Sequence, residues 1–266
     1  MGTDTTNKKI EEIKKLGKAD LHIHSNYSDG RPTIEEILDY VQDQTDLDVI
    51  AITDHDEIEG ALKAAELVKE KKYRFEVIVG EEVSSNEGHI VGLFLKKKIE
   101  PHQPDHEVLK QIKAQGGITV AAHPFENMRF VDSNGLTMDG IGLVNLIHEK
   151  RGFDAVEIVN ATPTLGEENT KAKFINRTLL FKAETGSSDA HIVEAIGKGY
   201  TIFEGKTKAD LRYALVHHQT QAMRAKWSIR ALFKYAFFFI PIGIRMTAFT
   251  LLHGRAEKKP QLTNIE

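Results

Sequence analysis

The feature that most constrains this chain is a series of short apolar runs, most of which end at a histidine or a carboxylate. The first is Asp20-Leu21-His22-Ile23-His24, where alternating apolar and polar side chains predict a β-strand. His22 and His24 are two residues apart, so on a strand they point to the same face, and two imidazoles on one face can share a metal ion. The turn sequence Ser28-Asp29-Gly30 follows and keeps the Asp29 carboxylate close to this pair.

The same arrangement recurs further along the chain. Residues able to bind metals follow apolar runs in Thr53-Asp54-His55-Asp56, Gly80-Glu81-Glu82, Ala121-Ala122-His123-Pro124 and Gly186-Ser187-Ser188-Asp189-Ala190-His191, and His89 opens the run at residues 90–93. A single His-Xaa-His pair would most often be a surface pair, but its repetition at the ends of apolar runs favours a shared site. In a barrel of parallel strands, active sites lie at the carboxyl ends of the strands.

The predicted elements alternate between strand and helix, which indicates parallel strands with right-handed crossovers. Strands are predicted at residues 19–24, 48–53, 75–83, 89–95, 118–122, 154–159, 184–188 and 195–203, and helices at residues 33–42, 57–71, 105–115, 141–150, 167–181 and 208–217. The link at residues 85–88 is too short for a helix, so its two flanking strands are predicted to form a hairpin. We interpret residues 125–140 as a loop over the site.

Composition limits the chemistry. The chain has 266 residues and no cysteine, so a metal site must use His, Asp and Glu, a ligand set that suits zinc, manganese or iron. A net charge of -4 gives no case for binding duplex nucleic acid, while a single nucleotide or a short nucleic-acid end stays open as substrate. The amino end lacks the apolar segment of a secretory signal, which predicts a cytoplasmic protein.

Taken in order, these motifs resemble those of the PHP family, the polymerase and histidinol phosphatase metallophosphoesterases. The resemblance covers residues 18–205 through six motifs. It implies an α/β fold, a distorted (β/α)7 barrel of the PHP type with a three-metal cluster at the strand ends. We expect a charged lead-in at residues 1–17, the barrel at 18–225 and an apolar and basic C-terminal extension at 226–266.

The resemblance also implies a ligand set when it is carried over motif by motif. The first metal would be held by His22, His24, Glu82 and Asp189, the second by Glu82, His89 and His123, and the third by Asp29, His55 and His191. The Gly-Xaa-Glu-Xaa-Ser register favours Glu82 over Glu81 as the bridging ligand, and Glu81 is kept as the alternative. Ser188 lengthens the usual Gly-Ser-Asp motif by one residue and leaves the ligands in place.

This set predicts a metal-dependent phosphoesterase with two or three divalent ions (Mn, Fe or Zn), acting through a hydroxide that bridges them. The substrate would be a small phosphorylated metabolite, a nucleotide or a short nucleic-acid end. Asp54 is a candidate acid, or it orients a ligand histidine. Glu157 is a second candidate for orienting a ligand. Arg129 and then Arg31 are the candidate phosphate-binding cations, and Asn160 is a candidate substrate contact. The alternatives are a metallohydrolase of amides, and a non-catalytic metal-binding module acting through its C-terminal segment.

The C-terminal extension differs from the rest of the chain. Residues 226–260 hold seven Lys or Arg and one Glu, and the part at 227–252 is rich in large apolar side chains interrupted by Lys234, Pro241 and Arg245. Three interpretations stay open for residues 226–252: a helix pair that packs on the barrel or across a dimer, a segment attached to a membrane surface, and a membrane-spanning helix. The second would make the protein peripheral at the membrane.

Overall fold

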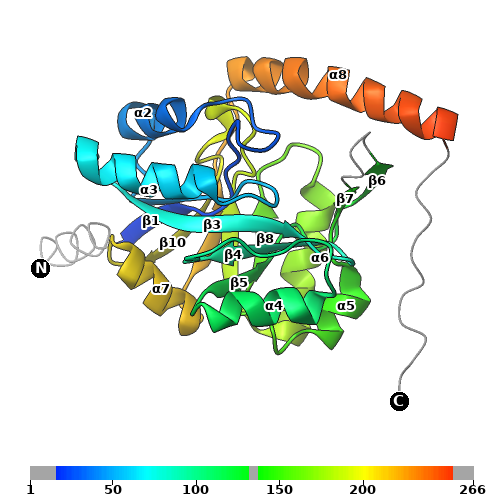
Figure 1. Ribbon diagram of the computed structural model, residues 1–266, viewed down its shortest axis with the longest axis horizontal. Coiled ribbons are helices and arrows are strands. Elements are labelled where there is room, and N and C mark those ends of the chain that lie inside the picture. The colour runs from blue at the N-terminus through cyan, green and yellow to red at the C-terminus, as the bar shows by residue number, and fades with distance from the viewer. Residues whose placement is uncertain (1–15, 132–136, 254–266) are drawn as a thin grey trace, which may run out of the picture.

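The computed structural model describes residues 16–131 and 137–253, with side chains described outside residues 127–139, 246, 249, 250 and 253 (Figure 1). Residues 1–15 of the predicted lead-in therefore lie outside the described part. The strands are β1 (Leu16–Asp20), β2 (Val49–Ile52), β3 (Glu76–Ser84), β4 (His89–Leu93), β5 (Ile118–Ala121), β6 (Asn127–Val131), β7 (Thr137–Asp139), β8 (Ala155–Asn160), β9 (Ala183–Ser187), β10 (Gly199–Glu204) and β11 (Gln221–Arg224). The α-helices are α2 (Ile34–Gln44), α3 (Glu59–Lys71), α4 (Asp105–Ala114), α5 (Gly142–His148), α6 (Gly166–Ile175), α7 (Lys208–Val216) and α8 (Ile229–His253).

Nine strands form one sheet in the order β11-β10-β1-β2-β3-β4-β5-β8-β9. The runs β1-β2-β3 and β5-β8-β9 are parallel, and β4 lies antiparallel between them as the predicted hairpin partner of β3. The sheet closes almost fully where the Thr201 hydroxyl of β10 donates to the Gly186 carbonyl of β9 and accepts from the Gly186 N–H, at 2.9 and 3.0 Å. The expected distorted α/β barrel is therefore confirmed.

Apolar side chains fill the barrel and the space between its strands and helices. Helix α2 begins with a capping box between Thr33 and Glu36, which satisfies two backbone N–H groups at the helix start. Its buried residues Ile37, Leu38 and Val41 belong to the core that α2, α3 and the adjacent strands share. Strand β2 is buried along its whole length, as expected for a strand covered on both faces. These contacts hold the carboxyl ends of the strands in fixed positions.

Several predicted elements were wrong in extent or type. Residues 125–140 contain the β6–β7 hairpin, whereas we predicted a loop. The first strand ends at Asp20, and an isolated parallel bridge between Ile23 and Ala190 follows it. The predicted helix at residues 167–181 is α6 followed by a π-helical turn at Asn176–Leu180, and β11 was not predicted.

In the described part of the C-terminal extension, residues 226–253, there is one helix, α8, with Pro241 inside it, and not the helix pair that was one of the three interpretations. Figure 1 shows α8 along the top of the view, next to β6 and on the opposite side of the molecule from α4 and α7. Within the described residues, none of the helices combines the length and apolar character required to cross a membrane.

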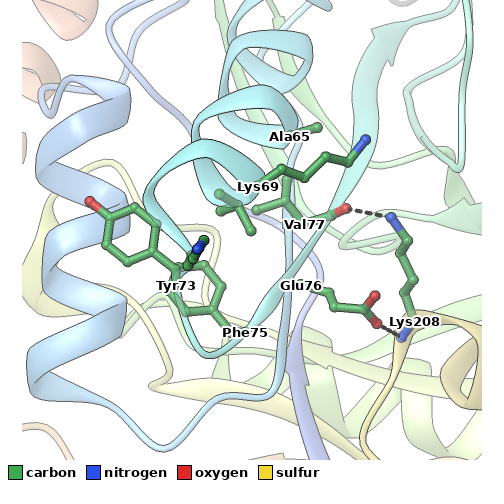
Figure 2. Close-up of a pocket in the computed structure, with 9 residues that line it drawn as sticks. Ala65, Lys69, Tyr73, Phe75, Glu76, Val77 and Lys208 are labelled. Carbon is green, nitrogen blue, oxygen red and sulfur yellow. Dashed lines mark hydrogen bonds between the residues drawn. The ribbon is translucent and has the colours of Figure 1, made fainter.

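A pocket lies between α3 and the beginning of β3 (Figure 2). Its polar lining includes Lys69, Glu76 and Lys208, and the Glu76 carboxylate accepts a hydrogen bond from the Lys208 backbone N–H. Glu76 is the first residue of β3 and Glu82 lies six residues further along the strand, which separates them by about 20 Å. The pocket is therefore remote from the predicted metal ligands.

Asp105, the first residue of α4, gives the fold a dependence on pH. Burial raises the pKa of its carboxyl from 3.8 to about 8, and the neighbouring Glu87 adds to the effect. Between pH 4 and pH 8 the Asp105 carboxyl therefore stays protonated in the folded state and is ionised in the unfolded chain. Its contribution to the free energy of unfolding falls as the pH rises through this range. We expect Asp105→Asn to flatten the dependence, with a gain of about 1–3 kcal/mol over wild type at pH 9. Urea unfolding at pH 5 and pH 9 measures the free energy of unfolding of both proteins. The same change between the two pH values in wild type and Asp105→Asn would contradict the prediction.

Candidate metal centre

The structure brings all nine predicted ligands together at the carboxyl ends of the barrel strands. Their nitrogen and oxygen atoms form four overlapping groups, within each of which the atoms lie at most 4.8 Å apart. The groups are His22, His24 and Asp189; His22, Glu82 and His123; His55, Glu82 and His89; and His24, Asp29, His55 and His191. The side chains that the resemblance divides among three metals therefore form one continuous cluster.

Glu82 lies at the centre of this cluster. Its two carboxylate oxygens lie 2.9–3.3 Å from five imidazole nitrogens, which belong to His22, His24 and His55 on one oxygen and to His89 and His123 on the other. Burial alone opposes ionisation of Glu82, but the surrounding imidazoles hold the pKa of its carboxyl well below its usual range. An anionic carboxylate with both oxygens engaged is suited to bridge two cations.

Two aspartates complete the cluster at its edge. Asp189 Oδ1 lies 3.1 Å from His24 Nε2, and Asp29 Oδ2 lies 3.1 Å from His191 Nε2. The Asp29 loop approaches closely because Gly30 follows it: a Cβ at Gly30 would lie 2.5 Å from the His24 carbonyl carbon. Asp189 and His123 have φ values of 51° and 23°, in the left-handed region where non-glycine residues are strained. Strain of this kind is typical of residues whose position serves a site.

The donor set fits divalent metal ions. Buried ring nitrogens of His24, His55, His89 and His123 lie next to carboxylate oxygens without making a well-aligned hydrogen bond, and buried polar atoms left in this state are costly. Burial lowers the pKa of His24, but Asp189 and Glu82 outweigh it and raise the value to about 10. At His55 burial prevails and lowers the pKa to about 3. Bound cations would balance the carboxylates in place of imidazole protons and would bind the ring nitrogens that make no hydrogen bond.

Glu81 and Glu82 lie on opposite faces of β3. Glu81 is buried outside the cluster, and its Oε2 accepts a hydrogen bond from the Ile99 N–H at 2.8 Å. Burial raises the pKa of Glu81 to about 8. Because side chains alternate along a strand, only one of the two glutamates can face the histidines, and the structure places Glu82 there.

Comparison with known proteins agrees with this geometry. The model of the PHP domain matches residues 20–239. The chain belongs to the PHP domain family. An uncharacterized protein of Methanocaldococcus jannaschii is 35% identical over 147 residues, which cover 49% of this chain and 83% of that protein. The resemblance predicted from the motifs is thereby confirmed.

Solved structures with the same fold include two bacterial proteins. A two-domain protein from Bacteroides vulgatus, containing a predicted PHP-like metal-dependent phosphoesterase, has a TM-score of 0.60 and 20% identity, with 79% of this chain and 65% of that chain covered. PsfC from Pseudomonas syringae has a TM-score of 0.59 and 20% identity, with 86% and 99% covered. This chain thus spans slightly less than two thirds of the length of the Bacteroides protein, and at this identity the likeness establishes the fold.

Glu157 on β8 contacts two of the candidate ligands from inside the barrel. Its Oε1 lies 3.2 Å from His22 Nδ1, and its Oε2 accepts bonds from the His123 N–H and the Asn160 amide, at 2.8 and 3.0 Å. Glu157 therefore faces the barrel interior and orients two candidate ligands. Asn160 was predicted to contact substrate, but it is fully buried and its amide also donates to Asp189 Oδ2 at 3.1 Å. Asn160 thus positions carboxylates, and its contact with substrate stays a prediction.

The Asp54 carboxylate contacts two serines of the turn before Asp29. Its carboxylate accepts hydrogen bonds from the Ser25 N–H, the Ser25 hydroxyl and the Ser28 hydroxyl, at 2.7, 2.6 and 2.6 Å. The side chain is fully buried and holds the turn that carries Asp29. Asp54 therefore positions a ligand loop, and its predicted role as an acid or as a partner of a ligand histidine stays a prediction.

The two predicted phosphate-binding arginines lie on segments next to the cluster. The Arg31 backbone N–H donates to the His191 carbonyl at 2.9 Å, and the residue is exposed. Arg129 belongs to β6, and its side chain lies outside the described residues. Arg31 is therefore the candidate cation that the structure places beside a ligand.

Sequence reasoning missed three residues at this site. Glu126 is buried, with its Oε2 3.0 Å from His123 Nδ1; burial raises the pKa of Glu126 to about 7. The Phe239 ring of α8 lies edge-on to the His191 ring with centroids 5.5 Å apart, and the Tyr235 ring packs against Phe239 at a tilt of 32°, with centroids 4.2 Å apart. The spacing of Glu126 from His123 was a usable signal, whereas nothing in the motifs links α8 to the site.

Replacing Glu157 with glutamine should weaken metal binding. Glutamine keeps the volume but loses the charge that fixes the His22 ring, and such supporting contacts are worth about 10–100-fold in metal affinity. The Mn²⁺ concentration for half-maximal activity should rise by that factor, while excess Mn²⁺ restores most of the rate. Glu184→Gln is the matched control, because Glu184 lies on β9 and pairs with Arg177 away from the cluster. An unchanged Mn²⁺ requirement in Glu157→Gln would contradict the role.

Proposed function

We propose that the protein is a metal-dependent phosphoesterase that hydrolyses a phosphate ester of a small phosphorylated metabolite, a nucleotide or a short nucleic-acid end. The observation that carries the proposal is the Glu82-centred cluster, in which one carboxylate contacts five imidazoles. Such a site concentrates positive charge once cations are bound, and phosphoryl oxygens are the groups that such charge stabilises.

The cofactor is two or three divalent ions, with Mn, Fe or Zn as the candidates for a site made only of nitrogen and oxygen donors. Glu82, His89 and His123 would hold one, His22, His24 and Asp189 with Glu82 another, and Asp29, His55 and His191 the third. When bound, they lower the pKa of water and neutralise phosphoryl oxygens, so no side-chain nucleophile is required.

The surrounding residues orient this chemistry and limit its access. Glu157 fixes the ring of His22 and the backbone of His123, and Asp54 fixes the turn that presents Asp29. Arg31 is the residue proposed to bind substrate phosphate, since a guanidinium can donate two parallel hydrogen bonds to two oxygens of one phosphate. Phe239 and Tyr235 cover the His191 side of the cluster. That cover favours a small substrate or the end of a chain over the middle of a duplex.

The test compares bond types in one preparation loaded with Mn²⁺. We expect turnover of p-nitrophenyl phosphate or bis(p-nitrophenyl) phosphate and none of p-nitroacetanilide. Preference for the monoester would point to a phosphatase, and preference for the diester to cleavage of nucleic-acid ends. Turnover of the anilide alone would instead make the protein an amide hydrolase and reject the proposal.

A further inference from the structure

The outward face of α8 is an apolar stripe without a partner in the described part of the chain. Six large side chains repeat at intervals of three, four and seven residues, so they fall on one side of the helix. They are 59–81% exposed: Ile229, Phe233, Phe237, Ile240, Ile244 and Leu251. A helix of 25 residues is about 37 Å long, so the stripe forms an extended apolar surface of a kind that soluble monomers rarely expose.

The opposite face of α8 is already attached to the barrel, which fixes the direction of the stripe. Trp227, just before the helix, donates its indole N–H to the Ala161 carbonyl at 3.0 Å. Tyr235 and Phe239 lie over the site, and Lys234 pairs with Glu194. The helix therefore cannot turn its outward stripe into the barrel core without losing these contacts.

Charge distinguishes between the occupants that could cover this stripe. Residues 226–253 contain four Lys or Arg and no Asp or Glu, while the whole chain has a net charge of -4. A second copy of α8 laid on the first would bring like charges together. Lys234 already pairs with Glu194, so Lys226 and Arg230 are the basic side chains that a surface of anionic lipid headgroups would bind, while the apolar stripe enters the boundary between headgroups and acyl chains.

We infer that the outward face of α8 docks this protein on an anionic membrane surface, with the helix lying in the plane of the interface. Pro241 and the basic residues fit this position, since an interfacial helix needs neither an unbroken apolar span nor a neutral sequence. The metal cluster would then lie directly under the membrane-bound helix, because the inner face of α8 contacts His191.

The test is co-sedimentation of the full chain with vesicles of phosphatidylcholine alone or mixed 3:1 with phosphatidylglycerol. We expect binding to the mixed vesicles, weaker binding in 0.5 M NaCl, and at least about tenfold weaker partitioning for Phe233→Glu/Phe237→Glu. Phe174→Glu is the matched control: Phe174 on α6 is 64% exposed, similar to the stripe, but lies outside it. It should bind like wild type.

Three outcomes would overturn the inference. Wild type could fail to bind the anionic vesicles, or the double variant could bind as well as wild type. Alternatively, wild type could be a dimer by light scattering that the double variant converts to a monomer, with no vesicle binding, which would make the stripe a dimer interface. Ile240→Ser/Ile244→Ser provides a second variant should the first lose its circular dichroism spectrum. Vesicle binding is measured without substrate, so its result is independent of the proposed activity.

Discussion

Replacing Glu82 with glutamine should lower kcat/KM for a phosphate ester by about a thousandfold. Glu82 is the only side chain whose two oxygens contact both halves of the described cluster, with three imidazoles on one oxygen and two on the other. Glutamine has nearly the same shape, but its amide nitrogen cannot accept a cation and its oxygen carries no charge. Two potential metal positions therefore lose a ligand at once. Steady-state rates with p-nitrophenyl phosphate and saturating Mn²⁺ measure the loss.

Glu81→Gln is the control for this prediction. Glu81 is the preceding residue on the same strand and is equally buried, but it faces away from the histidines and accepts a bond from the Ile99 N–H. Because burial raises the pKa of Glu81 to about 8, its carboxyl is mostly protonated at neutral pH and glutamine replaces it closely. We expect activity within about threefold of wild type. A severe loss in Glu81→Gln with an active Glu82→Gln would show that the bridging ligand is assigned to the wrong residue.

The candidate ligands could be predicted from the sequence because most of them lie at the ends of apolar runs that form strands. Parallel strands end at one edge of a barrel, so side chains that follow apolar runs, such as His55, His123 and Asp189, come together although they are far apart in the chain. The choice of Glu82 over Glu81 came from the Gly-Xaa-Glu-Xaa-Ser register of the resemblance, and alternation along β3 explains why only one of the two faces the histidines. Local signals also sufficed for α2, whose capping box is contiguous in sequence.

The residues that surround the ligands could not be assigned in this way. Asp54 bonds to Ser25 and Ser28, and Asn160 bonds to Glu157 and Asp189, through side-chain rotamers that depend on the finished packing. A strand-end position therefore predicts that a residue is near the site but not what it contacts. Phe239 shows the same limit at longer range, since its contact with His191 joins the end of the chain to a motif 48 positions earlier.

Removing divalent ions should both abolish phosphate-ester hydrolysis and lower the melting temperature. A ligand present at about 100 times its Kd stabilises the folded state by about 2.7 kcal/mol, which for a chain of this size corresponds to about 5–10 °C. In the described site, His24, His55, His89 and His123 have buried nitrogens without hydrogen bonds, so a bound cation relieves a cost that the metal-free protein carries. We expect dialysis against EDTA to give this drop, and added Mn²⁺ to restore both the rate and the melting temperature.

Two variants separate a specific effect from a general effect of ions on the fold. Asp189→Asn keeps the shape of a residue inside the cluster and removes a charge that contacts His24 at 3.1 Å, so its melting temperature should respond much less to Mn²⁺. His148→Ala removes an exposed imidazole on α5, away from the cluster, and should respond like wild type. Equal Mn²⁺ stabilisation in wild type and Asp189→Asn would place the stabilising ion elsewhere. Full activity after exhaustive chelation would show that the hydrolysis does not depend on bound metal ions.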